Sequence, residues 1–96
     1  MNLKLNKKNA WVCGSTQGIG KASAIALAEL GANVTLIARN EEKLKQVVAE
    51  LPNKYQNHNY IVADFENPKE LSEKVAIGLK TIGTFHILVN NSFYSI

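Results

Sequence analysis

A glycine-rich segment is the part of this sequence best suited to hold a ligand: Gly14, Ser15, Thr16, Gln17, Gly18, Ile19 and Gly20. Glycines lack a Cβ, so their backbone N–H groups can approach a phosphate closely, and a helix starting there adds the positive end of its dipole. The hydroxyls of Ser15 and Thr16 are further donors. The spacing G-x-x-x-G-x-G differs from the G-x-G-x-x-G of ordinary dinucleotide folds and from a P-loop. The segment predicts a pyrophosphate site, with a plain tight connection as the alternative.

The residue that would choose between nucleotides is expected where the second strand ends. NAD sites usually carry Asp or Glu there, to accept hydrogen bonds from the ribose 2′-hydroxyl. This sequence has Ala38 followed by Arg39, and a guanidinium suits a 2′-phosphate through forked, charge-assisted hydrogen bonds. NADP(H) is therefore the predicted cofactor. The alternative is that Arg39 is a solvated loop charge; Glu41 and Glu42 are explained by the dipole of the helix that they begin.

Two hydrophobic patterns alternate along the chain and define the elements that would position these residues. Short apolar runs predict four strands, at residues 9–13, 33–38, 60–63 and 85–89. Between them, apolar residues recur at the spacing of one helical face. The faces expected to be buried are Ile19, Ala22, Ser23, Ala26, Leu27 and Leu30, then Leu44, Val47, Val48 and Leu51, and finally Leu71, Val75, Leu79 and Ile82.

Helix ends are marked by residues with known capping roles. Gly31 is placed to end the first helix in a left-handed conformation. Asn40 is the expected N-cap of the second helix. The third should begin at Asn67, with Pro68 in the first turn and Glu70 completing a capping box.

The order of elements, β-α-β-α-β-α-β, predicts an α/β protein. Near-continuous apolar strands alternating with helices favour a parallel sheet covered on both faces. Right-handed crossovers then give a Rossmann-type three-layer fold with four strands in the order 3-2-1-4. The glycine turn, Arg39, Asp64 and the pair Asn90 and Asn91 all follow strands, so they should meet at one edge of the sheet, where the switch point predicts a ligand.

Composition narrows the class of protein. The 96 residues suit one domain spanning 1–96, and the net charge of +3 is attributed to a solvated amino-terminal segment rather than to a nucleic-acid site. The single cysteine, Cys13, cannot form an internal disulfide and favours a reducing compartment. The start of the chain has no long apolar stretch, so no membrane association is expected. We expect a cytoplasmic protein without a metal site.

Four motifs in order resemble the short-chain dehydrogenase/reductase family. They are the turn at 14–20, Ala38-Arg39-Asn40, Asp64 and the run 87–91. The resemblance covers residues 5–91 and is strongest to 3-oxoacyl-acyl-carrier-protein reductase-like members. It implies that the three glycines of the turn hold the pyrophosphate and that Ile19 touches the nicotinamide end.

The resemblance also implies the remaining contacts of the cofactor. Arg39 would bind the 2′-phosphate, and Asp64 would accept from the adenine amino group, with Phe65 beside it in the site. Asn90 and Asn91 would join strand 4 to its neighbours and touch the adenosine ribose. The open alternatives are that Asp64 caps the following turn and that the asparagines are simple loop residues.

The sequence also departs from the family pattern. Ser92 and Phe93 stand where members continue with Ala-Gly, and Gln17 stands where many NADP-dependent members have a basic residue. The family's catalytic Ser, Tyr and Lys would lie downstream, and this sequence contains no Tyr-x-x-x-Lys. We therefore assign no catalytic residue, and His86 is expected to be a core or rim imidazole.

Together these features predict the NADP(H)-binding amino-terminal portion of an oxidoreductase, inactive as 96 residues alone. In intact form it would transfer hydride between NADPH and a carbonyl or alcohol. The alternatives are a non-catalytic nucleotide-binding module and a structural remnant that pairs with a full-length homologue. The apolar run at 85–89 has no charge or proline to block edge pairing, which predicts marginal stability or self-association.

Overall fold

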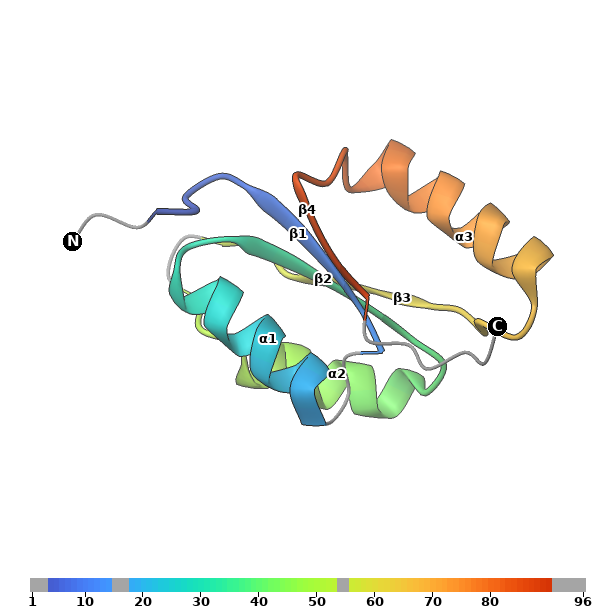
Figure 1. The fold of residues 1–96 in the computed structure, drawn as a ribbon, viewed down its shortest axis with the longest axis horizontal. Coiled ribbons are helices and arrows are strands. Elements are labelled where there is room, and N and C mark those ends of the chain that lie inside the picture. Colours follow the sequence, from blue (N-terminus) through green and yellow to red (C-terminus); the bar gives the residue numbers. More distant parts are fainter. Residues whose placement is uncertain (1–3, 15–17, 54–55, 91–96) are drawn as a thin grey trace.

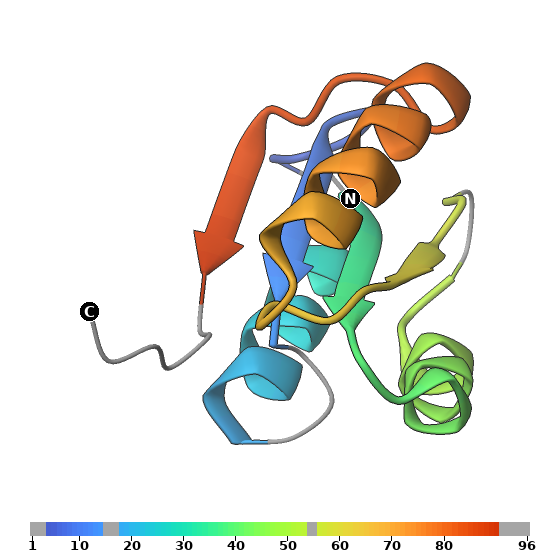
Figure 2. The ribbon, with the colours of Figure 1, turned by 90° about the vertical axis from the view of Figure 1, so that its right-hand side faces the viewer.

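The computed structural model describes residues 4–14, 18–53 and 56–90. Its strands are parallel and hydrogen-bonded in the order β3-β2-β1-β4. Helices α1 and α2 cover one face of the sheet and α3 covers the other (Figures 1 and 2). The predicted three-layer Rossmann-type fold and its strand order are thus confirmed. The elements are β1 (Asn9–Cys13), α1 (Gly18–Glu29), β2 (Asn33–Ala38), α2 (Glu41–Glu50), β3 (Asn59–Val62), α3 (Pro68–Thr81) and β4 (Ile87–Asn90).

Small residues bring α1 against the sheet. Gly20, Ala24 and Ala28 are the buried positions of this helix, whereas Ile19 is 73% exposed and Leu30 is 42% exposed. The inward face expected from the sequence was therefore wrong for α1. Apolar side chains surround most of this helix, so periodicity does not single out a face. The structure buries the smallest residues because they permit the closest approach to the strands.

The opposite face of the sheet is built around Trp11. Its indole is 1% exposed and lies 5.3 Å, centroid to centroid, from the ring of Phe85. Gly78 of α3 is buried close to both Trp11 and Ile61: a Cβ built on it would lie 2.7 Å from Ile61 Cδ1 and 3.0 Å from Trp11 Cη2. This close approach turns Leu79, an expected core residue, outward to 40% exposure. Leu79 was thus predicted wrongly, since a glycine occupies the inward position.

The predicted helix signals operate as local hydrogen bonds. Asn40 Oδ1 accepts from Lys43 N at 3.1 Å, and Asn67 Oδ1 accepts from Glu70 N at 3.2 Å. The capping box around Asn67 is only half formed, because Asn67 N donates to Asp64 O at 3.0 Å instead. In a complete capping box the Glu70 side chain would accept from Asn67 N; here the carbonyl of Asp64, in the loop before α3, accepts that hydrogen bond instead.

Strand β4 begins two residues later than the sequence pattern predicts. His86 N donates to Asn9 O at 2.8 Å, while Asn9 N donates to Nδ1 of the His86 ring at 3.0 Å. The ring lies exposed at the rim of the sheet, where it fastens the start of β4 to β1. The strand then forms one edge of the sheet, with Leu88 53% exposed.

The contact at Gly78 predicts a strong size limit. We expect Gly78→Val to lower the free energy of unfolding by roughly 1–3 kcal/mol, because the added atoms must displace the Ile61 side chain and the Trp11 indole. Urea unfolding followed by Trp11 fluorescence measures this. Ala76→Val, an exposed site on the same helix, controls for the helix propensity of valine. Equal unfolding midpoints for the two variants would contradict the packing.

Candidate functional site

The glycine turn leaves β1 through left-handed backbone. Gly14 has φ 71° and Gly18 has φ 62°, conformations that favour glycine. Gly14 N donates to Ile37 O at 2.8 Å, which continues the β1–β2 ladder past the strand end. A Cβ placed on Gly18 would meet no atom of the described residues within 4 Å, so these residues leave the space in front of this backbone open. The expected contacts of Ser15, Thr16 and Gln17 fall outside the described residues.

The first turn of α1 is suited to an anion. The described first turn contains no acidic residue to offset the positive end of the dipole. Gly20 is buried and seats the helix on the sheet, while the side chain of Ile19 is exposed beside the turn. The exposed, apolar side chain of Ile19 is compatible with the contact to the nicotinamide end that the family resemblance implies for this residue.

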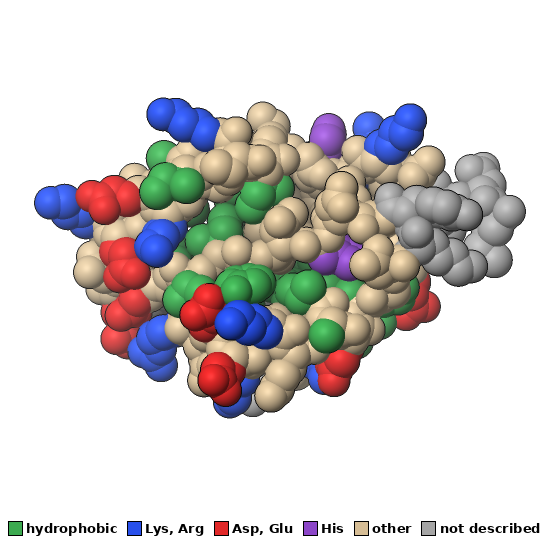
Figure 3. Space-filling model, turned by 180° about the vertical axis from the view of Figure 1, so that it is seen from behind, with side chains coloured by type: hydrophobic (Ala, Val, Ile, Leu, Met, Phe, Trp, Pro, Cys, Tyr) green, Lys and Arg blue, Asp and Glu red, His purple; other side chains and the backbone are tan. Residues whose placement is uncertain are grey.

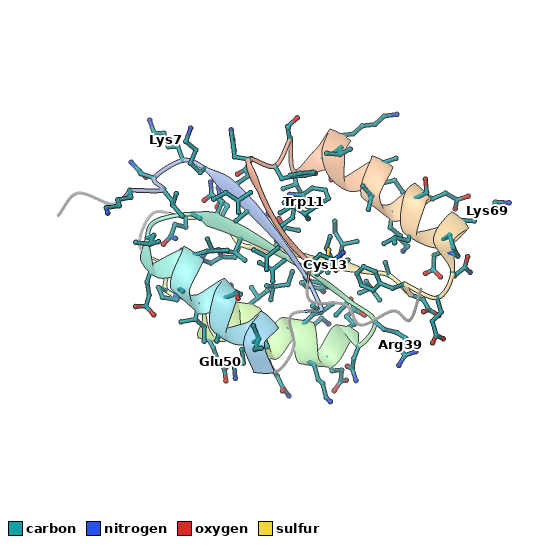
Figure 4. All side chains as sticks on the ribbon, viewed as in Figure 1. Lys7, Trp11, Cys13, Arg39, Glu50 and Lys69 are labelled. Carbon is teal, nitrogen blue, oxygen red and sulfur yellow. The ribbon has the colours of Figure 1, made fainter. Side chains whose placement is uncertain are left out.

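Arg39 follows β2 at the same edge of the sheet. Ala38 O accepts from Ala63 N at 3.0 Å, so the backbone around Arg39 is held between its two neighbouring strands. The guanidinium is exposed, and within residues 4–14, 18–53 and 56–90 it forms no hydrogen bond or ion pair. It points away from the end of β2, next to the start of α2 (Figure 4). Arg39 thus combines a backbone that is held by the neighbouring strands with an exposed guanidinium, an arrangement that can bind an anionic group.

Asp64 serves the turn that follows β3. Its Oδ1 accepts from Glu66 N at 2.9 Å, and its carbonyl accepts from Asn67 N. The turn-capping alternative therefore accounts for one carboxylate oxygen, and Oδ2 is left for another donor. Phe65, next in the chain, packs partly buried against the cluster that contains Trp11.

Asn90 lies at the end of β4, next to the end of β1. It pairs in register with Cys13, the last residue of β1, and its side chain is exposed. The expected role of Asn91 lies outside the described residues. The Cys13 thiol is 8% exposed and points toward α3 (Figure 4). Burial raises the pKa of this thiol, so Cys13 is a packing residue rather than a reactive one.

One polar contact near this edge was missed by reading the sequence. The hydroxyl of Tyr60 on β3 donates to Glu41 Oε2 of α2 at 2.9 Å. From the sequence, Glu41 was expected to interact only with the dipole of α2. Because Glu41 and Tyr60 are 19 residues apart, no local sequence pattern predicts their contact, and only the folded arrangement of β3 and α2 reveals it.

The described parts of the chain contain no group of three or more His, Cys, Asp or Glu that could hold a metal ion. No described helix is both long and apolar enough to cross a bilayer. On the face seen in Figure 3, basic and acidic side chains are interspersed around a band of hydrophobic ones.

Comparison with known proteins identifies the family. The family model described as short chain dehydrogenase matches residues 8–93, and the chain belongs to this family. It is 42% identical over 85 residues to a very-long-chain 3-oxoacyl-CoA reductase of Anas platyrhynchos, and 46% identical over 85 residues to the human inactive hydroxysteroid dehydrogenase-like protein 1. Each alignment covers 85% of this chain, but 27% and 25% of the respective relative.

A solved structure gives the same relation. The chain superposes along its whole length on L-sorbose reductase from Gluconobacter frateurii, which was crystallised with NADPH and L-sorbose, with a TM-score of 0.84 and 29% identity. It covers 37% of that protein. The chain therefore spans about a quarter to a third of the length of the relatives that it matches.

The backbone of Gly18 predicts a separation between stability and binding. Gly18→Ala should cost about 1–2 kcal/mol of folding free energy, because alanine disfavours the left-handed region. Gly18→Asn should cost less, since asparagine tolerates that region. Both variants add a Cβ in front of the turn, so both should weaken dinucleotide binding. Urea unfolding and calorimetric titration measure the two effects; a variant that binds as tightly as the wild type would contradict the site.

Proposed function

We propose that this chain is the NADP(H)-binding part of a short-chain oxidoreductase. The observation that carries the proposal is the meeting of three features at the carboxyl edge of the sheet. Gly14 and Gly18 have left-handed backbone at the turn after β1, α1 begins there with no acidic residue in its described first turn, and Arg39 follows the neighbouring strand with an exposed guanidinium that has no partner within the described residues. A diphosphate needs the first two features, and a 2′-phosphate needs the third.

In this proposal, each residue of the site would contact a different part of the cofactor. The glycine turn would take the pyrophosphate, and Arg39 would take the 2′-phosphate. Asp64, through the oxygen that the turn leaves over, would accept from the adenine amino group, and Asn90 would border the adenosine ribose. The open space at Gly18 supports this fit. The NADPH complex of L-sorbose reductase, a structural relative, supports the choice of dinucleotide.

The chemistry of the whole protein is a further proposal. When bound, NADP(H) supplies or accepts a hydride at its nicotinamide ring, and the partner would be a carbonyl or an alcohol. The 96 residues contain no Tyr-x-x-x-Lys pair to act as proton donor. We therefore assign binding and orientation of the cofactor to these residues, and no catalytic step.

Arg39 provides the direct test of the proposal. Arg39→Ala should weaken NADPH binding by roughly 10- to 100-fold, because it removes a charge-assisted contact to the 2′-phosphate. The affinity for NADH, which lacks that phosphate, should not change. Titration of both cofactors measures the ratio. Lys80→Gln, which removes an exposed charge from the last turn of α3, is the control and should leave the ratio unaltered; equal losses for both cofactors would reject the assignment.

A non-catalytic nucleotide-binding module is the second candidate. It is favoured by the human relative named inactive hydroxysteroid dehydrogenase-like protein 1, which is 46% identical to the chain over 85 residues. A protein of this kind would bind the dinucleotide but would not transfer hydride. The two candidates differ in one measurement: whether NADPH bound to the protein is oxidised when carbonyl compounds are supplied.

Self-association is proposed at the edge formed by β4. This strand has a neighbour on one side only among the described strands, and Leu88 is 53% exposed on it. Edge strands with apolar side chains pair readily with other chains. Leu88→Lys should shift the protein toward monomer in sedimentation measured over a range of concentrations. Leu30→Lys, at a 42% exposed position after α1, is the matched control; a wild type that is monomeric throughout would contradict the proposal.

A further inference from the structure

The hydrogen bond between Tyr60 and Glu41 lies beside the residue proposed to select the cofactor. Glu41 is the first residue of α2 and stands two positions after Arg39. Its carboxylate accepts from the Tyr60 hydroxyl at 2.9 Å. This hydrogen bond is the main cause that raises the pKa of Tyr60, with desolvation and the Glu41 charge adding to it. A tyrosine hydroxyl is protonated at physiological pH even at its ordinary pKa, so Tyr60 is a donor there, and the raised pKa extends this to higher pH.

Tyr60 is well anchored for this task. Tyr60 lies on β3, an outer strand of the four-stranded sheet, where it pairs in register with Leu36 of β2, and its ring packs half-buried against the core beneath α1 and α2. A ring held by strand and core presents its hydroxyl at a fixed point, so the carboxylate that it binds is held there as well.

An unrestrained carboxylate at this position would oppose cofactor selection in two ways. It could pair with the exposed guanidinium of Arg39, and it would repel a 2′-phosphate bound there. Glu42 also belongs to the first turn of α2, but within the described residues it has no hydrogen-bonding or ionic partner. Glu41 is therefore the one acidic group near Arg39 whose direction another side chain controls.

We propose that Tyr60 is a positioning residue for cofactor selection: its hydroxyl holds the Glu41 carboxylate against β3 and leaves Arg39 available to the 2′-phosphate. The inference rests on the proposed NADP(H) site and names a further determinant of it. It also explains how acidic residues can follow an arginine at the end of β2 in a chain that selects NADP(H).

Tyr60→Phe tests this, because it removes the hydroxyl and keeps the packed ring. The dissociation constant for NADPH should rise about two- to fivefold, the range expected for exposed charge pairs, while that for NADH stays the same. Adding Glu41→Gln to Tyr60→Phe should restore the NADPH affinity, since the freed carboxylate is then gone. Glu42→Gln in the Tyr60→Phe background is the matched control and should not restore the loss that Tyr60→Phe causes.

The outcomes separate the inference from the proposed function. An unchanged NADPH-to-NADH ratio in Tyr60→Phe, together with a lost preference in Arg39→Ala, would overturn the role of Tyr60 and leave the site intact. Equal weakening of both cofactors in Tyr60→Phe would show a merely structural role and would also overturn it. A wild-type chain that binds NADPH no better than NADH would reject the proposed function itself.

Discussion

The structure depends on the register of parallel strands at one edge of the sheet. Gly14 N donates to Ile37 O, and Ala63 N donates to Ala38 O, so two backbone hydrogen bonds flank the residue before Arg39. A shift of one residue in either pairing would move every side chain of that strand to the opposite face. Because both faces are packed, the register is strongly specified. The positions of the glycine turn, the arginine and Asp64 follow from it.

Packing on the two faces sets how the helices meet this edge. On one face the small residues Gly20, Ala24 and Ala28 let α1 lie close to the strands. On the other face Trp11 fills the space under α3, and Gly78 accommodates it. The Trp11 Nε1 atom has no hydrogen-bond partner within the described residues, a cost of polar burial that dense packing around the ring must offset.

The sequence predicted what short-range patterns encode and missed what depends on three-dimensional neighbours. Strand order followed from apolar runs and right-handed crossovers, and the Asn40 and Asn67 caps followed from local side-chain chemistry. The buried face of α1 was misjudged because its apolar residues surround the helix, and proximity to the sheet made the choice. The Tyr60–Glu41 bond was missed because its partners lie on different elements. The three residues of the turn that fall outside the described part remain predictions from sequence alone.

If Arg39 binds a phosphate as proposed, the start of α2 combines two electrostatic requirements that conflict. Glu41 and Glu42 stabilise the helix by about 0.3–1 kcal/mol each through its dipole, but the same charges would disfavour a phosphate held by Arg39. Neutral residues there would favour the phosphate and weaken the helix. A hydrogen bond from the Tyr60 hydroxyl directs the Glu41 carboxylate toward β3, while Glu41 remains in the first turn of α2, where the dipole acts on its charge. On the proposed assignment, the edge strand thus lets one short segment both begin a helix and receive an anion.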